Sequence, residues 1–109
     1  MTQALATATV IDLAEQGEVD LSALLTGPLR QARLVALPAE QAETLSADDR
    51  EHTLFFLEGS GTAQSGDTLV VVSVGTAVTV PQGSTVTVSA RRGPLRYFHA
   101  SLMVQAGGA

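Results

Sequence analysis

The feature that most constrains the fold of this chain is a series of short β-branched and aromatic runs separated by glycine turns. It is clearest between Glu51 and Gly83, where apolar runs at 52–57 and 68–74 flank a connection punctuated by glycine. Runs of this composition, bounded by Gly, Ser and Asp, are typical of strands joined by turns. Their spacing predicts an all-β sandwich or closed barrel.

Further strands are expected on both sides of this stretch. Residues 84–90 alternate Val with Ser and Thr, which is the cleanest period-two pattern in the chain. The run 68–74 is continuously apolar and predicts a strand buried on both faces, entered through a hairpin at Ser65-Gly66-Asp67. The remaining predicted strands are 8–13, 29–37, 61–64, 76–80 and 95–104, of which 61–64 is expected to be a short edge strand.

Polar segments are expected to lie between the strands. Residues 15–20 are acidic and contain Gly17, and residues 40–50 are polar and acidic, so both are predicted to be loops. Asp20 is expected to cap a turn of helix over 21–25, because its carboxylate can accept the free amide hydrogens there.

Length and composition limit the partners. A chain of 109 residues with 45% hydrophobic content suits one domain, 1–109, in which we expect 1–7 and 105–109 to be flexible. The net charge of -5 argues against nucleic acid and anionic membrane surfaces as partners. Cysteine is absent, which excludes disulfides and thiolate metal sites. With no signal sequence evident and no apolar run near the roughly 20 residues of a membrane span, a cytoplasmic location is expected.

The turn residues of the central stretch resemble two sequence motifs of the cupins. The second cupin motif begins with glycine, five residues, proline, one residue and glycine, and Gly75, Pro81 and Gly83 have this spacing. The end of the first motif is similar to the turn Leu57-Glu58-Gly59. The resemblance covers about 34–102. It implies a cupin-like double-stranded β-helix, a jelly-roll barrel of two packed antiparallel sheets.

The positions that hold a metal in cupins carry other residues here. Val86 stands where the second motif has histidine, and His52 stands where the first has glutamate. The paired histidines of the first motif fall on residues without metal-binding imidazoles, either Leu45 and Ala47 or Ser46 and Asp48. We therefore expect no metal and no other cofactor. The alternative is a triad of His52, His99 and a carboxylate of Asp48 or Glu51.

Strand alternation predicts which side chains face the barrel interior. If His52 points inward, so do Leu54 and Phe56, whereas Phe55 and Leu57 point outward. On the opposite strand, the inward set includes Val86 and Val88. These residues predict either an apolar pocket with His52 as its titratable group or a filled core. In the pocket His52 is a candidate general acid or base; the alternative is a histidine hydrogen-bonded to a neighbouring loop.

The last strand leaves two arrangements open. One face carries Leu95, Tyr97, His99 and Ser101, and the other carries Arg96, Phe98, Ala100 and Leu102. If the first face is inward, Tyr97 and His99 join His52 as ligand-binding residues. We expect the second face inward, because it buries more apolar area.

Three functions follow from the resemblance. The first is a small-molecule-binding cupin, acting as a metal-independent isomerase, cyclase or lyase in a bacterial biosynthetic pathway through His52. The second is a non-catalytic accessory or structural protein, and the third is a metal-dependent oxygenase with non-standard ligands. The resemblance also implies a homodimer, for which outward Phe55 and Leu57 suit an interface.

Overall fold

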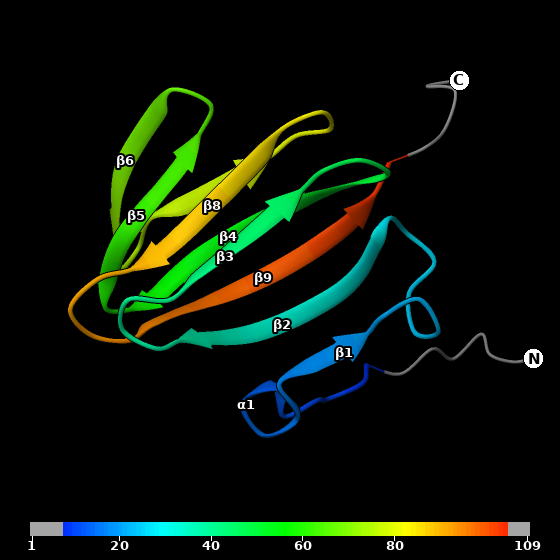
Figure 1. The fold of residues 1–109 in the computed structure, drawn as a ribbon. Helices are drawn as coiled ribbons and strands as arrows, with labels where there is room; N and C mark the ends of the chain where they lie inside the picture. The colour runs from blue at the N-terminus through cyan, green and yellow to red at the C-terminus, as the bar shows by residue number, and fades with distance from the viewer. Residues whose placement is uncertain (1–7, 105–109) are drawn as a thin grey trace, which may run out of the picture.

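The computed structural model describes residues 8–104, which form two antiparallel sheets packed face to face (Figure 1). Sheet A has the strand order β1-β2-β9-β4-β7, formed by Glu18–Asp20, Leu29–Leu37, Leu95–Met103, Arg50–Glu58 and Ala77–Val80. Sheet B has the order β3-β8-β5-β6, formed by Ala42–Ser46, Thr85–Ala90, Ser60–Ser65 and Thr68–Ser73. The predicted all-β jelly roll is confirmed. The termini that were expected to be flexible, 1–7 and 105–109, lie outside the described residues.

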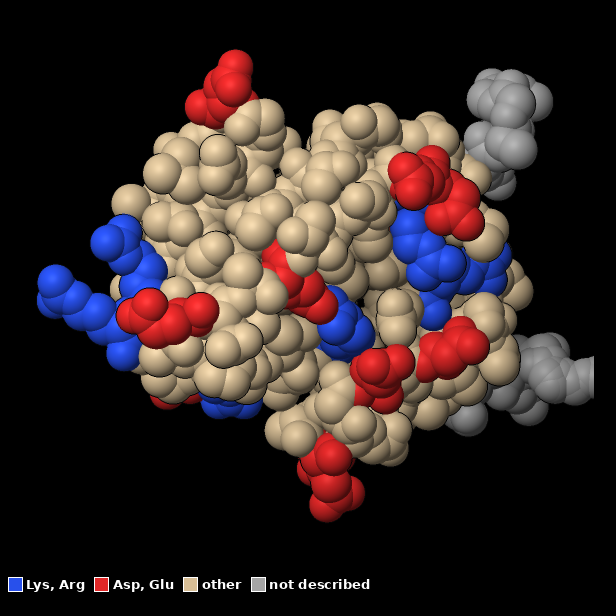
Figure 2. Space-filling model, viewed as in Figure 1, with Lys and Arg blue, Asp and Glu red and all other residues tan. Residues whose placement is uncertain are grey.

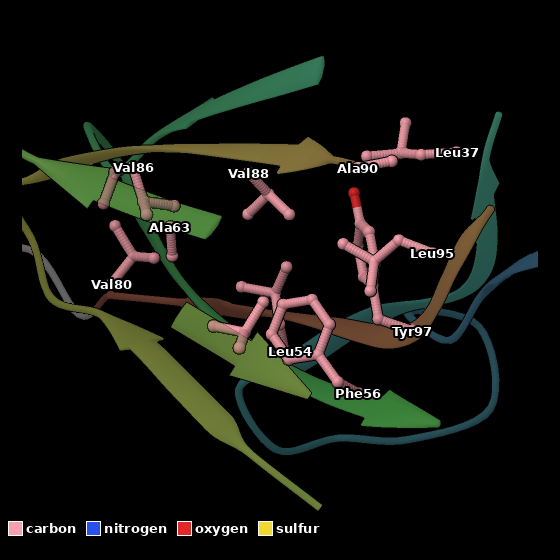
Figure 3. Packing of buried hydrophobic residues seen from close by; sticks show 12 residues of the cluster. Leu37, Leu54, Phe56, Ala63, Val80, Val86, Val88, Ala90, Leu95 and Tyr97 are labelled. Carbon is pink, nitrogen blue, oxygen red and sulfur yellow. The ribbon is translucent and has the colours of Figure 1, made fainter. Parts of the chain in front are cut away.

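The core lies between the sheets and follows strand alternation. On β4, His52, Leu54 and Phe56 are buried, whereas Phe55 and Leu57 are 45% and 41% exposed, as predicted. On β8, Val86 and Val88 are buried on the facing surface, also as predicted. Figure 3 shows side chains of β4 and β8 converging in the gap between the sheets. Burial of this cluster removes apolar area from water and is the main force that joins the two sheets.

The N-terminal segment differs from the prediction. In place of a strand at 8–13 there is a short helix, α1, at Leu13–Gln16, which begins because the Asp12 carboxylate accepts the Glu15 amide hydrogen at 3.1 Å. Within the expected loop, β1 adds to the edge of sheet A by pairing with β2. No helix among residues 8–104 has the length and hydropathy to cross a membrane.

The turn that Asp20 was expected to cap is present. Its carboxylate accepts hydrogen bonds from the Ser22 amide at 2.9 Å and the Ser22 hydroxyl at 2.6 Å. The Leu25 amide donates to the Leu21 carbonyl at 2.8 Å, which closes one turn of helical type. The prediction was therefore correct in both the turn and its cap.

The segment 40–50 was wrongly predicted to be all loop, because it contains β3. Glu43 and Leu45 are half-buried and alternate with exposed neighbours, and the whole strand pairs with β8. The polar composition concealed a period-two pattern that is stabilised by pairing with a distant strand. The preceding turn places Glu40 at φ 69°, a left-handed conformation that favours glycine.

Strand β6 was predicted to be buried on both faces, and this was wrong. It lies at the edge of sheet B and pairs only with β5, so Val72 is buried while Val71 is 71% exposed. The run 61–64 was predicted to be an edge strand and this was also wrong, because β5 pairs with both β6 and β8. Composition alone could not distinguish an edge strand from a central one. The predicted hairpin at 65–67 is confirmed, since Ser65 pairs with Thr68 and Gly66 has φ 59°.

The glycines of the two cupin-like motifs are required by the backbone. Gly59, Gly75 and Gly83 all have positive φ, at 87°, 92° and 91°. At Gly59 an added methyl group would also overlap the Pro94 carbonyl oxygen, which lies in the loop before β9. The motif spacing is therefore set by turn geometry.

Candidate functional site

Two histidines lie side by side on the inner face of sheet A. His52 is on β4 and His99 is on the neighbouring strand β9, where Ser101 is directly opposite His52. Their ring centroids are 5.0 Å apart, and His52 Nδ1 lies 2.9 Å from His99 Nε2. Both rings are nearly excluded from water, at 7% and 3% exposure. The structure thus brings together His52, His99 and Tyr97, three of the predicted site residues.

The expectation that the Phe98 and Leu102 face of the last strand points inward was wrong. Tyr97, His99 and Ser101 are buried on the inner face, whereas Phe98 and Leu102 are only half-buried on the outer face. The expectation rested on buried apolar area alone and took no account of hydrogen-bond partners for the polar side chains. Here each polar side chain of the inner face has hydrogen-bond partners, which removes most of that cost.

The hydrogen bonds around the two histidines have a single direction. Arg33 on β2 donates from Nε to His99 Nδ1 at 2.8 Å, and a guanidinium can only donate. His99 therefore carries its proton on Nε2 and donates it to His52 Nδ1. His52 in turn donates from Nε2 to the carbonyl oxygen of Ser46 at 3.0 Å. Both rings are therefore neutral and protonated on Nε2.

A carboxylate from the opposite sheet fixes the arginine that begins this chain. Glu43 on β3 accepts from Arg33 Nη2 at 3.0 and 3.1 Å through its two oxygens, and it also accepts the Tyr97 hydroxyl proton. Since β3 belongs to sheet B, Glu43 and the Ser46 carbonyl both link the sheets. We call the set Arg33, Glu43, His52, Tyr97 and His99 the polar network.

The electrostatics of the polar network follow from burial and from Arg33. Burial lowers the pKa of His99 to about 4, and the charge of Arg33 and the neighbouring His52 act in the same direction. Burial raises the pKa of Glu43, but the hydrogen bonds from Arg33 and Tyr97 outweigh this effect, so the pKa is below its usual value. Burial and the Glu43 carboxylate raise the pKa of Tyr97. At neutral pH, His99 is uncharged, Glu43 is ionised and Tyr97 keeps its proton.

The donor set does not fit a cupin-type metal ion. All four ring nitrogens of His52 and His99 are engaged in hydrogen bonds, and the guanidinium of Arg33 lies against His99. Among residues 8–104 no group of three or more His, Cys, Asp or Glu residues is placed to hold a metal. The alternative triad of His52 and His99 with Asp48 or Glu51 is therefore not assembled in this part of the chain, and Glu51 precedes His52 and lies on the opposite face of β4.

Next to the polar network, the inner face of sheet A carries a polar pocket of about 370 Å³, which we call the mouth pocket. Gln31 in its wall is paired with Ser101, and Arg50 and Met103 lie one row beyond His52 and Ser101 on the same face. Figure 2 shows basic and acidic groups side by side on the face viewed there. The full lining is Glu18, Asp20, Ser22, Arg30, Gln31, Arg50 and Met103.

The predicted apolar ligand contacts lie in the core instead of in the wall of the mouth pocket. Leu54, Phe56, Val86 and Val88 are at most 3% exposed and pack in one cluster with Tyr97, whose ring is 5.3 Å from that of Phe56 (Figure 3). Their role as ligand contacts stays a prediction. A smaller hollow of about 170 Å³ borders His52 with Val80 and Pro81, on the side of β7.

Sequence reasoning missed Arg33 and Glu43. Arg33 shares strand parity with buried Leu37, so a charged residue at an inward position was a usable signal. Glu43 was hidden because its strand was read as a loop. The pairing of the two across the sheets could not be inferred without the fold.

No protein-family model and no curated protein matches the sequence. Solved structures match its fold. A cupin protein from Bacteroides fragilis has a TM-score of 0.68 at 19% identity, covering 94% of this chain and 86% of that one. A predicted oxalate decarboxylase from Thermotoga maritima has a TM-score of 0.71 at 12% identity, covering 79% and 76%. KdgF from Halomonas sp. has a TM-score of 0.64 at 11% identity, covering 75% and 76%.

These similarities establish the fold class. The two sheets, the motif glycines and the solved structures together show that the chain has the cupin fold. Within that fold, this chain places an arginine-bound histidine pair at the inner wall of the barrel.

Proposed function

We propose that this protein is a metal-independent cupin that binds a small molecule in the mouth pocket. The observation that carries the proposal is the 2.8 Å hydrogen bond from Arg33 Nε to His99 Nδ1, because a cation already occupies the position from which a metal would bind this ring. The mouth pocket supports binding, since its volume lies at the lower end of the range for small-molecule sites.

Elemental analysis tests the metal-independent part of the proposal. The protein is purified without chelators and then titrated with Mn²⁺, Fe²⁺, Ni²⁺ and Zn²⁺. We expect well under one metal equivalent as purified and no saturable binding on addition. One equivalent of metal that is lost on substituting His52 and His99 together would overturn it.

A fragment screen tests the binding part. Two-dimensional NMR spectra are recorded with a library of acids, amines and neutral polar compounds. We expect at least one saturable binder whose shifts map to the lining of the mouth pocket, such as Gln31 and Met103. The absence of any binder mapping to this lining, or binders mapping only elsewhere, would refute the proposed site.

His52 is the proposed acid or base for an isomerase, cyclase or lyase reaction in a bacterial biosynthetic pathway. It lies one row from Arg50 of the mouth pocket on the inner face of β4, and its Nε2 donates to the Ser46 carbonyl at 3.0 Å. Its test is the His52→Gln variant, whose amide can still donate to Ser46. Turnover of a bound ligand by the wild type and not by a folded variant that still binds supports catalysis. Binding without turnover in both proteins favours the non-catalytic alternative.

We also propose that two copies associate through the outer face of sheet A. Phe55, Phe98 and Leu34 are consecutive across β4, β9 and β2, and Phe55 is 45% exposed. A contiguous apolar row of this kind is commonly covered by a partner. Light scattering of the wild type is expected to give twice the chain mass. Phe55→Ser should weaken the association of the two copies, whereas the control Thr62→Ser on β5 should leave the association unchanged. A wild-type mass of one chain contradicts the proposal.

A further inference from the structure

The mouth pocket is lined by arginines and carboxylates that form no direct ion pair with each other among residues 8–104. Arg30 and Arg50 line it from β2 and β4, and Glu18 and Asp20 line it from β1. Among residues 8–104, no ion pair joins either arginine to either carboxylate. Arg50 has only a long contact of 3.6 Å with exposed Asp49. In the sheet order β1-β2-β9-β4 the two carboxylates lie at the β1 edge, Arg30 is on the next strand and Arg50 lies farther in on β4. We call the β1 side the anionic wall and the side of Arg30 and Arg50 the cationic wall.

The cationic wall has unused donors. Arg30 Nε is buried without a hydrogen-bond partner in the described part of the chain, and a buried donor in this state is costly. Guanidinium groups present fixed forks of N–H donors that match the oxygens of a carboxylate. A carboxylate held between Arg30 and Arg50 fits this wall.

The anionic wall has unused acceptors. Glu18 accepts from Gln31 Nε2 at 3.1 Å through one oxygen, and Asp20 accepts from Ser22 through one oxygen. An ionised carboxylate has about four acceptor positions, so both can accept further hydrogen bonds. The Ser22 hydrogen bonds, and to a smaller extent the charge of neighbouring Arg30, keep the pKa of Asp20 below its usual value, so the wall stays negative at neutral pH. An ammonium group fits this wall.

We infer that the mouth pocket selects a small zwitterion, with its carboxylate at Arg30 and Arg50 and its ammonium at Glu18 and Asp20. This inference rests on the proposed binding function and names its ligand class. A dianion of the same length would place one carboxylate against Glu18 and Asp20, and a diamine would place one ammonium against the arginines. Each mismatch leaves like charges adjacent, so the two walls reject both.

Ligands of matched length and different charge test this inference. The zwitterions are glycine, β-alanine and 4-aminobutyrate, and the controls with four carbons are succinate and 1,4-diaminobutane. The reporter is the ¹³C-labelled methyl group of Met103, which lines the pocket and is one of only two methionines in the chain. Titrations at equal ionic strength give a Kd for each compound.

At least one zwitterion is expected to shift the Met103 signal saturably and to bind at least tenfold more tightly than succinate and 1,4-diaminobutane. Arg30→Met should weaken that zwitterion at least tenfold, whereas Arg91→Met, in the exposed turn before β9, should leave its Kd unchanged. Glu18→Gln combined with Asp20→Asn should shift the preference toward succinate.

Succinate or 1,4-diaminobutane binding as tightly as every zwitterion would overturn the inference and leave the proposed binding function intact. If none of the five compounds moves the Met103 signal, the zwitterion class is also refuted. The binding function is then decided separately by the fragment screen, because that screen includes neutral compounds.

Discussion

Acidification between pH 7 and pH 4.5 should destabilise this protein through His99. The folded state holds the pKa of this ring at about 4, below its ordinary value of 6.5. The unfolded chain therefore binds a proton first as the pH falls. The stabilisation is fully present above pH 6.5 and is lost progressively toward pH 4. Between pH 7 and pH 4.5 the free energy of unfolding should therefore fall by roughly 2 kcal/mol.

The physical reason is visible in the contacts of the ring. A second proton on His99 would go to Nδ1, where Arg33 already donates from Nε at 2.8 Å, so two N–H groups would face each other. The ring could escape this clash only by displacing the Arg33 guanidinium, which is also held by Glu43. The charges of Arg33, Arg50 and Glu43 all act on the ring, and Glu43 alone opposes the two arginines.

Urea denaturation at half-unit pH steps measures this effect. With an m-value of roughly 1–3 kcal/mol per molar, the wild-type midpoint should fall by about 1 M between pH 7 and pH 4.5. The matched variant is His99→Gln, whose side chain does not titrate and whose amide can donate to His52. Its midpoint should change much less over the same interval. A wild-type midpoint that is constant or rises on acidification, or an equal slope in both proteins, refutes the reasoning.

Three substitutions, and one control substitution, test other parts of the structure by urea denaturation at pH 7. Glu40→Gly should raise the free energy of unfolding by about 1 kcal/mol, because Glu40 has φ 69°; no gain contradicts the strain. Gly61→Ala should lower the free energy of unfolding by about 2–3 kcal/mol, because the new methyl group overlaps the Ser89 carbonyl oxygen. In the control Gly93→Ala the new methyl group meets no atom within 4 Å, so the free energy of unfolding should change little. Tyr97→Phe should cost about 1–2 kcal/mol and raise the pKa of Glu43, which loses a donor; an unchanged pKa argues against that hydrogen bond.

Local patterns were sufficient to predict much of the fold. Alternation along 52–57 and 84–90 placed the inward and outward side chains correctly, because both strands have one face on the core. The spacing of Gly75, Pro81 and Gly83 indicated the barrel, because these turns need positive φ at glycine. The run 68–74 misled, since only the sheet order reveals that β6 is an edge strand.

The site was less predictable because it depends on contacts between distant strands. His52 could be identified from the position of a missing carboxylate ligand, and Tyr97 and His99 could be named as alternatives. Arg33 contacts His99 across 66 positions of sequence, and Tyr97 contacts Glu43 across 54. No local pattern encodes such a pairing. The choice of face on β9 followed from these polar contacts and not from apolar area.

The direction of the hydrogen bonds through the two histidines is the central claim, and long-range ¹H–¹⁵N NMR of the imidazole rings tests it directly. At pH 7.5 the spectrum of the wild type should show both His52 and His99 as neutral rings protonated on Nε2, with Nδ1 as the unprotonated nitrogen. A proton on Nδ1 of either ring, or a doubly protonated ring, would contradict the account, because Arg33 can donate only to an unprotonated nitrogen.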